Sequence, residues 1–237
     1  MTAAGPAAPA LRLADVQRVD FGEIWPPGDG PAGAGPPLPV HGFVICHPSG
    51  AILVDTGVGD PAAREFVRAW RPVARRVADA LAPLGLAPAD VRWVINTHLH
   101  WDHCGQNAVF THAPFVVQRQ EYETAAIREG VVMEWFQVSG ARFELVEGAA
   151  TVVPGVRVVP TPGHTTGHQA VAVTTDAGLV VLAGDAADTI DAYRTADPGG
   201  GAEPEDPEQW RASIAAVRAL APARVLVCHD LAEWRSG

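Results

Sequence analysis

The 237-residue sequence contains no lysine, and all 17 of its basic residues are arginines. The absence of lysine excludes Schiff-base chemistry on a lysine and the phosphate-binding lysine of a P-loop. Only three cysteines are present, at widely spaced positions, so a disulfide framework is not expected. No run approaches the ~18 apolar residues that cross a bilayer, and residues 1–10 have no basic region typical of a secretory signal. We therefore expect a cytoplasmic protein that does not associate with membranes.

Positive charge is also scarce. The formal net charge is −10 at pH 7, which disfavours nucleic-acid phosphate or an anionic membrane surface as the main partner. Hydrophobic residues make up 48% of the chain and charged residues 19%, a balance typical of globular proteins. We expect residues 1–237 to form a single domain with a sizeable core. The sequence does not indicate an oligomeric state.

Two segments are rich in proline and small residues. Residues 1–10 contain mostly Ala and Pro and are expected to be loose. Residues 26–39 (PPGDGPAGAGPPLP) hold so much Pro and Gly that a long loop is expected there. This loop could form a wall of a binding pocket, or it could be a surface loop without a function.

Strands and helices are interleaved along the rest of the chain. Capping signals and helical spacing predict helices after Asp60-Pro61 and after Asp206-Pro207, and further helices are expected over 73–84 and 119–128. Short apolar runs predict strands at 40–46, 51–54, 91–95, 114–118, 143–146, 156–159, 171–175, 179–183 and 224–228. Several strands are joined by hairpin signals such as Asp176-Ala177-Gly178. The pattern therefore predicts an α/β (α+β) protein with mixed sheets covered by helices, not a purely parallel sheet.

The segment Thr97-His98-Leu99-His100-Trp101-Asp102-His103 carries the strongest chemical signal. It places three imidazoles and one carboxylate directly after the apolar run 91–95. Neutral imidazole nitrogens and aspartate oxygens are good ligands for first-row metals. If the strand continues, alternation places His98 and His100 on one side of it, while Asp102 and His103 turn away. One short loop could then serve two neighbouring metal ions.

Three further candidate ligands follow apolar strands far downstream. His164, Asp185 and His229 come after the runs 156–159, 179–183 and 224–228. A lone buried His or Asp usually has a structural explanation, but the same placement behind four strands favours a common site. Cys104 and Cys228 are neighbours of such candidates and could be redox-sensitive thiols near the metals or small packing residues.

The set His98-x-His100-x-Asp102-His103 with His164, Asp185 and His229 resembles the ligand set of the metallo-β-lactamase superfamily of dinuclear metallohydrolases. Within it, the N-acyl-homoserine lactonases are most similar, through the segments ILVDTG (52–57), HLHWDHCGQN (98–107), VVQRQEYE (116–123), VVPGV (152–156), TPGHTTGHQ (161–169) and CHD (228–230). The resemblance implies the metallo-β-lactamase fold, an αββα sandwich of two mixed β-sheets flanked by helices. It extends along most of the chain.

The resemblance also implies a role for each candidate residue. One zinc would be held by His98, His100 and His164, and the other by Asp102, His103 and His229. Asp185 would bridge the two Zn²⁺ ions, although other divalent metals could occupy the site. Asp55 and His168 would orient the ligands by hydrogen bonding. His41, His47 and His112 match no ligand position and are interpreted as surface or packing residues.

One position departs from the pattern. In the lactonases that this chain resembles, a tyrosine three residues after the bridging aspartate donates its phenol to the substrate carbonyl, and Asp188 stands there in this chain. An ionised carboxylate cannot donate a hydrogen bond. Tyr193 could reach the site in its place, or it could face solvent.

The resemblance implies a hydrolase that opens lactones, of the quorum-quenching type. Two divalent cations lower the pKa of a bridging water, and the resulting hydroxide attacks a carbonyl, with Asp102 as a candidate for handling the proton. Other expected substrates are an ester, a thioester or a β-lactam. An iron-dependent oxidoreductase is a further alternative, but the diiron members have a glutamate where His100 stands here. A non-catalytic protein with a relic site would be expected to lose some ligands.

Overall fold

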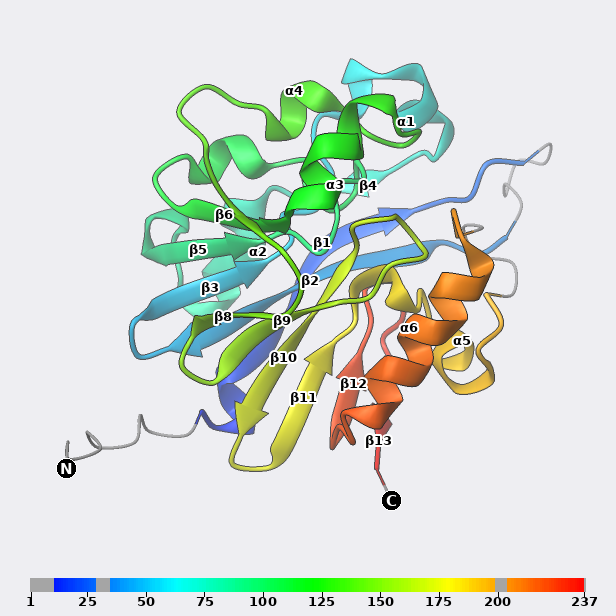
Figure 1. Cartoon of the computed structure of the whole chain (residues 1–237). Helices are drawn as coiled ribbons and strands as arrows, with labels where there is room; N and C mark the ends of the chain where they lie inside the picture. The colour runs from blue at the N-terminus through cyan, green and yellow to red at the C-terminus, as the bar shows by residue number, and fades with distance from the viewer. Residues whose placement is uncertain (1–10, 29–34, 199–203, 237) are drawn as a thin grey trace.

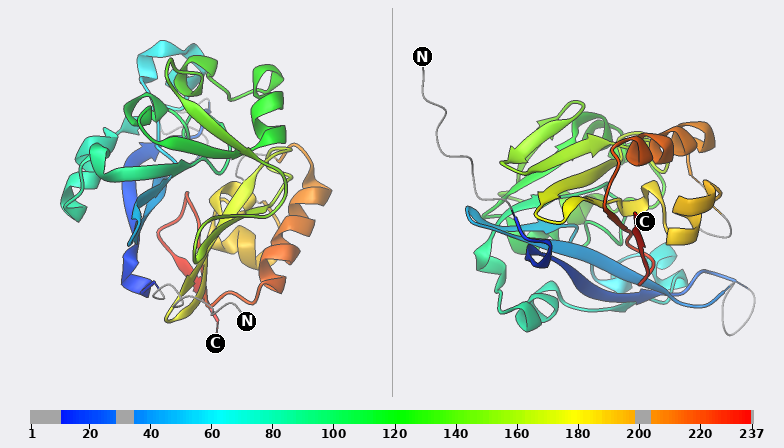
Figure 2. Two further views of the ribbon diagram at one scale, coloured as in Figure 1. Left: turned by 60° about the vertical axis from the view of Figure 1, so that its left-hand side comes forward. Right: turned by 90° about the horizontal axis from the view of Figure 1, so that it is seen from below.

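The computed structural model describes residues 11–28, 35–198 and 204–236, which form two mixed β-sheets with helices on their outer sides (Figures 1 and 2). In spatial order, the seven-stranded sheet contains β4 (Val73–Ala74), β1 (Val16–Ile24), β2 (Leu38–His47), β3 (Gly50–Val54), β5 (Val91–Ile95), β6 (Pro114–Gln118) and β7 (Arg142–Val146). The six-stranded sheet contains β13 (Glu233–Arg235), β12 (Arg224–Leu226), β11 (Gly178–Leu182), β10 (Gln169–Thr175), β9 (Val156–Pro160) and β8 (Ala150–Val153).

The α-helices and 3₁₀ turns connect and cover these strands. The α-helices are α1 (Glu65–Ala69), α2 (Val77–Leu81), α3 (Arg119–Thr124), α4 (Met133–Phe136), α5 (Ile190–Thr195) and α6 (Pro207–Ala219). The 3₁₀ turns are η1 (Leu13–Asp15), η2 (Pro61–Ala63), η3 (Ala82–Leu84), η4 (Pro88–Asp90), η5 (Asn107–Phe110), η6 (Ala125–Ile127) and η7 (Gly184–Ala186). Within the described ranges, every helix is too short or too polar to cross a bilayer.

Side-chain alternation along the strands creates a core between the sheets and another core on each outer face. Along β2, Phe43 and Ile45 face the second sheet, whereas Val44 packs on the outer side with α1 and α2. Along β10, Val171 faces the first sheet, and Ala172 packs on the outer side with α5 and α6. Each central strand is therefore apolar on both faces, and the result is the predicted helix–sheet–sheet–helix sandwich.

Most predicted elements are present, but the predicted helix over 73–84 is wrong in its first part. Val73 and Ala74 form β4, which pairs antiparallel with Glu23 and Gly22 of β1, and the helix α2 begins only at Val77. Arg71 has a positive φ of 44°, which ends the preceding helical segment. Val73 and Ala74 pair with residues distant in the sequence, and local sequence signals do not show such a pairing.

Gly22 permits this edge pairing. Its φ is +107°, and an added Cβ would lie 1.9 Å from the carbonyl oxygen of Val73. We expect Gly22→Ala to lower the free energy of unfolding by more than the matched control Gly85→Ala. Gly85 has a φ of +72° but no atom within 4 Å of an added Cβ, so it loses only about 1–2 kcal/mol from left-handed strain. Urea unfolding of both variants measures the difference, and equal losses would show that the contact with Val73 has no effect.

Other differences concern segments that carry weak sequence signals. No strand was predicted at β1, whose residues Val16–Ile24 mix apolar side chains with the charged Arg18, Asp20 and Glu23. The expected helix over 119–128 is present as α3 followed by η6. The strand predicted over 224–228 is β12, which ends at Leu226, and a further strand, β13, follows it. Of the expected loop 26–39, residues 29–34 lie outside the described residues, and Leu38 and Pro39 already belong to β2. Residues 1–10, which were expected to be loose, also lie outside the described residues.

Candidate metal centre

The predicted ligands lie on loops that leave the carboxyl ends of β5, β9, β11 and β12. His98 to His103 follow β5, His164 follows β9, and Asp185 lies in η7 directly after β11. The condition for aligning His98 with His100 by strand alternation is not met, because β5 ends at Ile95. The loop itself turns the two imidazoles toward one another.

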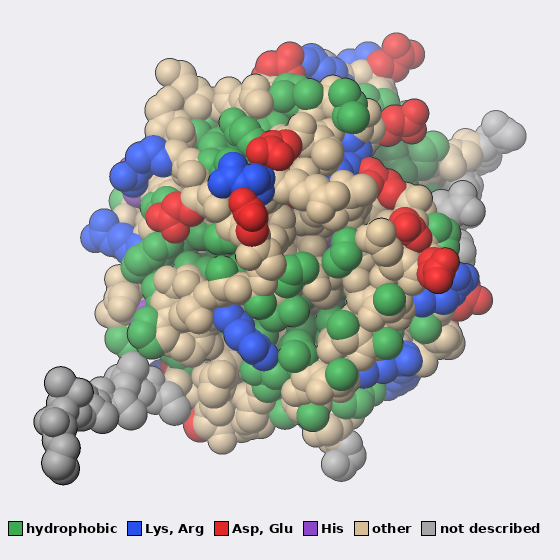
Figure 3. Space-filling view, in the orientation of Figure 1, with side chains coloured by type: hydrophobic (Ala, Val, Ile, Leu, Met, Phe, Trp, Pro, Cys, Tyr) green, Lys and Arg blue, Asp and Glu red, His purple; other side chains and the backbone are tan. Residues whose placement is uncertain are grey.

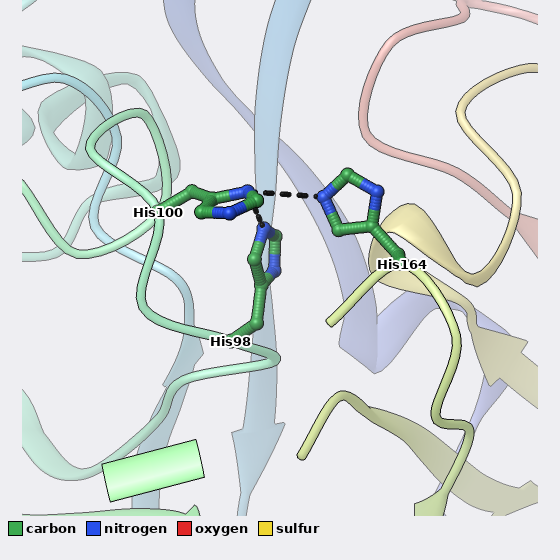
Figure 4. A group of neighbouring side chains, drawn as sticks. All are labelled: His98, His100 and His164. Carbon is green, nitrogen blue, oxygen red and sulfur yellow. Dashed lines mark hydrogen bonds between the residues drawn. The ribbon is translucent and has the colours of Figure 1, made fainter. Parts of the chain in front are cut away.

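Three imidazoles converge on one point from two loops (Figure 4). Nδ1 of His100 lies 3.0 Å from Nε2 of His98 and 3.0 Å from Nε2 of His164. A tetrahedral zinc with Zn–N bonds of ~2.0–2.1 Å separates its ligand nitrogens by roughly 3.3 Å. The spacing of the three nitrogens is therefore close to that of a single metal site.

A second group lies beside the first. Nε2 of His103 is 3.6 Å from Oδ2 of Asp102, and Nε2 of His229 is 3.5 Å from the same oxygen. All three side chains are at least nine-tenths buried. Their ligand atoms lie within 4.8 Å of one another, so these residues also fit one metal ion.

Asp185 lies between the two groups. Its Oδ2 is 3.4 Å from Nε2 of His164 on one side, and 3.4 Å and 3.5 Å from Nε2 of His103 and His229 on the other. Its Oδ1 is buried without a hydrogen-bond partner, as is Nε2 of His103. Buried polar atoms are normally satisfied, and unpaired nitrogen and oxygen atoms that face a shared space are the donor set that a divalent cation satisfies.

Hydrogen bonds behind the imidazoles fix which nitrogen faces the centre. Nδ1 of His103 donates to Oδ2 of Asp55 at 2.9 Å, so the lone pair of Nε2 points toward Asp185. The other contacts of Asp55 come from the backbone N–H and the hydroxyl of Thr97, both at 2.8 Å. Asp55 thus connects β3 to the start of the ligand loop, and its φ of +61° allows this reach.

Two further contacts act in the same way. Nδ1 of His229 donates to the carbonyl oxygen of Pro39 at 2.8 Å, and the sequence analysis did not identify this partner. A backbone carbonyl carries no residue-type signal, so only the fold could show it. Nε2 of His168 accepts the backbone N–H of Asp185 at 3.0 Å, while its Nδ1 faces the Thr161 hydroxyl. His168 therefore holds the backbone of Asp185 in place.

Burial and the carboxylates shift the pKa values of the two groups in opposite directions. Burial and neighbouring imidazoles lower the pKa of His98 and His100 well below the usual value. Burial opposes protonation of His229, but Asp185 and Asp102 outweigh it and raise its pKa to about 9. Similarly, the carboxylates raise the pKa of His103. A cation that binds His103 and His229 must therefore displace their protons.

A cavity of about 690 Å³ opens onto the candidate ligands. His100, Asp102, His164, Asp185 and His229 line its polar end. Its apolar walls are formed by Ile24, Leu38, Phe66, Trp70, Trp101 and Val131. The cavity can therefore hold a ligand with a polar reacting group beside the candidate metal ligands and an apolar part against the aromatic wall.

The two residues considered in place of the missing phenol lie in different places. Asp188 is 8% exposed and lines this cavity, with a side-chain oxygen near the ligand atoms of His164 and Asp185. Tyr193 belongs to α5, is buried, and packs against Trp234 with its hydroxyl unpaired. It lines a separate cavity beside Arg218, so the structure does not bring Tyr193 to the metal centre.

His41, His112, Cys104 and Cys228 are not members of the two candidate ligand groups. His41 belongs to β2 and is 5% exposed; its backbone N–H donates to the carbonyl oxygen of Cys228, and both of its ring nitrogens are buried without a hydrogen-bond partner. His112 is exposed. Burial raises the pKa of Cys228 to about 12 and also raises that of Cys104. Both thiols belong to apolar clusters, which favours the interpretation as packing residues.

The structure combines a sandwich of two mixed sheets between helices with a buried His/Asp cluster on the loops at the strand ends. This combination suits a protein that binds metal ions. A model of the metallo-beta-lactamase superfamily matches residues 35–229. The chain belongs to this superfamily.

Its relatives point to one branch of the superfamily. An N-acyl homoserine lactonase of Bacillus thuringiensis is 36% identical over 180 residues, which cover 71% of this chain and 72% of that protein. The N-acyl homoserine lactonase AttM of Azorhizobium caulinodans is 32% identical over 234 residues, or 86% of each chain. A solved structure of an N-acyl homoserine lactone hydrolase, with the product N-hexanoyl-L-homoserine at its catalytic metal center, superimposes with a TM-score of 0.79. It is 30% identical and the match covers 94% of this chain and 95% of that one.

Proposed function

We propose that this protein is a metal-dependent hydrolase that opens the ring of lactones, with N-acyl-homoserine lactones as the leading substrate class. The position of Asp185 carries the proposal, because one carboxylate oxygen lies within 3.5 Å of imidazoles from both ligand groups. This arrangement suits two adjacent cations better than one. The similarity to N-acyl homoserine lactonases along most of the chain supports the choice of substrate.

The residues divide between two metal ions. His98, His100 and His164 would hold one ion, and Asp102, His103 and His229 the other, with Asp185 between them. We propose two Zn²⁺ per chain, because imidazole and carboxylate ligands with tetrahedral spacing suit zinc. When bound, such a pair supplies an activated water and a Lewis acid for an ester carbonyl.

The side chains of the cavity define how a substrate would lie. Its lactone ring must approach the candidate metal ligands at the polar end of the cavity, beside Asp188. An acyl chain would then extend along Phe66, Trp70 and the other apolar walls, where burial of each CH₂ contributes about 0.8 kcal/mol.

On the face shown in Figure 3, basic side chains lie in separate places, several beside acidic ones, and this arrangement does not resemble a nucleic-acid surface.

A substrate panel on zinc-loaded protein tests the proposal. The panel contains acyl-homoserine lactones of several chain lengths, simple γ- and δ-lactones, a carboxylic ester, a β-lactam and a thioester. We expect ring opening of lactones, with longer acyl chains favoured over shorter ones, and bound metal measured by mass spectrometry near two per chain. Turnover of only the thioester or the β-lactam would contradict the proposal. Stoichiometric iron with oxygen-dependent turnover would favour an oxidoreductase instead.

Asp188 is the position at which the substrate preference can be tested directly. We expect Asp188→Tyr to raise kcat/KM for acyl-homoserine lactones about threefold to tenfold, the value of one added hydrogen bond to the substrate carbonyl. The matched control is Asp188→Phe, which supplies the same ring without the hydroxyl. Equal rates for the two variants, or no gain over the natural protein, would mean that the cavity is adapted to another lactone or ester.

A further inference from the structure

Glu121 is a buried carboxylate that the metal-ligand assignment leaves without a role. It belongs to the segment VVQRQEYE (116–123), in which the sequence shows no chemistry. Glu121 lies in α3 and is fully buried, and its Oε1 accepts the backbone N–H of Leu99 at 3.0 Å. Leu99 stands between His98 and His100, so this hydrogen bond reaches the middle of the ligand loop.

The other oxygen of Glu121 reaches the second ligand loop. Its Oε2 accepts the hydroxyl of Thr165 at 2.8 Å and the backbone N–H of Gly167 at 3.2 Å. Thr165 follows His164 directly. The backbones approach so closely that a Cβ on Gly167 would lie 2.2 Å from the backbone nitrogen of Glu121. One carboxylate therefore joins the loops that carry all three imidazoles of one candidate metal site.

Arg128 completes the arrangement. Its Nη1 donates to Oε1 of Glu121 at 2.6 Å, and its Nε donates to Glu205 at 2.7 Å. Glu205 in turn accepts the backbone N–H of Thr166 at 3.0 Å. Glu121 thus receives four donors and offers no proton. Only an ionised carboxylate is an acceptor at both ends, so neither Gln nor Ala can satisfy all four donors.

We propose that Glu121 is a positioning residue for the metal site formed by His98, His100 and His164. By fixing the backbones of the 98–100 and 164–167 loops, it holds three nitrogens at the spacing that one metal requires. The inference rests on the proposed division of the ligands between two metals. It does not require that the substrate be a lactone.

The test measures metal affinity separately at each site. In a His229→Ala background, which impairs the second group, we expect Glu121→Gln to weaken zinc binding at the remaining site about tenfold, the lower end of the range for residues that support metal ligands. In a His100→Ala background, which impairs the first group, we expect less than about a twofold change at the remaining site. Zinc affinity is measured by competition with a chelating dye.

The control and a second variant keep the result interpretable. Glu123→Gln changes an exposed glutamate on the same helix and should alter neither affinity. Thr165→Val removes one of the four donors, and we expect a smaller loss of zinc affinity confined to the His229→Ala background. If Glu121→Gln fails to fold, judged by circular dichroism, Thr165→Val decides the question.

Two outcomes would overturn the inference. Equal weakening in both backgrounds would mean that Glu121 only stabilises the fold, and no change in either would mean that it does not position the loops. Failure of the lactone panel with a site-selective loss of zinc would instead contradict the substrate and leave the role of Glu121 supported.

Discussion

Replacing Asp185 with alanine should reduce the rate of lactone opening by roughly a thousandfold and lower bound metal below two per chain. The physical reason is its central position, because one oxygen lies within 3.5 Å of His103, His164 and His229. Without this carboxylate, the two cations would face each other with less compensating charge. Loss of one ion removes several kcal/mol of transition-state stabilisation. Mass spectrometry of bound metal and kcat/KM on an acyl-homoserine lactone measure both effects.

The matched control for this prediction is Asp191→Ala. Asp191 lies on α5 a few residues further on and is exposed, so its loss should leave rate and metal content unchanged. His103→Ala should behave like Asp185→Ala, because His103 is the ligand nearest to Asp185 in the second group. An unaffected rate in either of these two variants would remove the two-metal assignment.

Asp55→Asn should weaken metal binding by about 10- to 100-fold, with a matching fall in activity at limiting zinc. Asp55 accepts hydrogen bonds from His103 and from two groups of Thr97. An amide has one accepting oxygen and would turn its NH₂ group toward one of these donors. His103 would then lose the partner that directs its Nε2 lone pair into the site.

Asparagine is chosen because the backbone conformation restricts the substitution. Asp55 has a φ of +61°, a region in which Asn and Asp are tolerated far better than Ala. Asp55→Asn therefore tests the hydrogen bonds, whereas Asp55→Ala would add backbone strain. We expect excess zinc to restore most of the activity of Asp55→Asn. Unchanged zinc affinity in this variant would show that the contacts with Thr97 are sufficient and that the hydrogen bond to His103 is not needed.

The sequence predicted the elements whose signals are local. Strand β5 (Val91–Ile95) and helix α6 (Pro207–Ala219) were identified from apolar spacing and from the cap at Asp206, whose side chain accepts from Glu208 and Gln209 as expected. Strands β1 and β4 were not, because their pairing depends on partners distant in sequence: β1 lies between β2 and β4, and β4 is an edge strand of only two residues. The same limit applied to Val73, which was assigned to a helix.

By itself, the sequence determined which side chains are available for a metal centre. The His98–His103 motif and the residues His164, Asp185 and His229 each follow a strand, and these positions depend only on local chain order.

The tertiary structure decided what surrounds those side chains. It placed Tyr193 in a core away from the cavity, gave His229 the carbonyl of Pro39, and joined two ligand loops through Glu121. Such contacts link residues far apart in the chain, and many of them are made by backbone groups that every residue type shares. For that reason a sequence can identify candidate metal ligands, while only the fold can show what holds them in place.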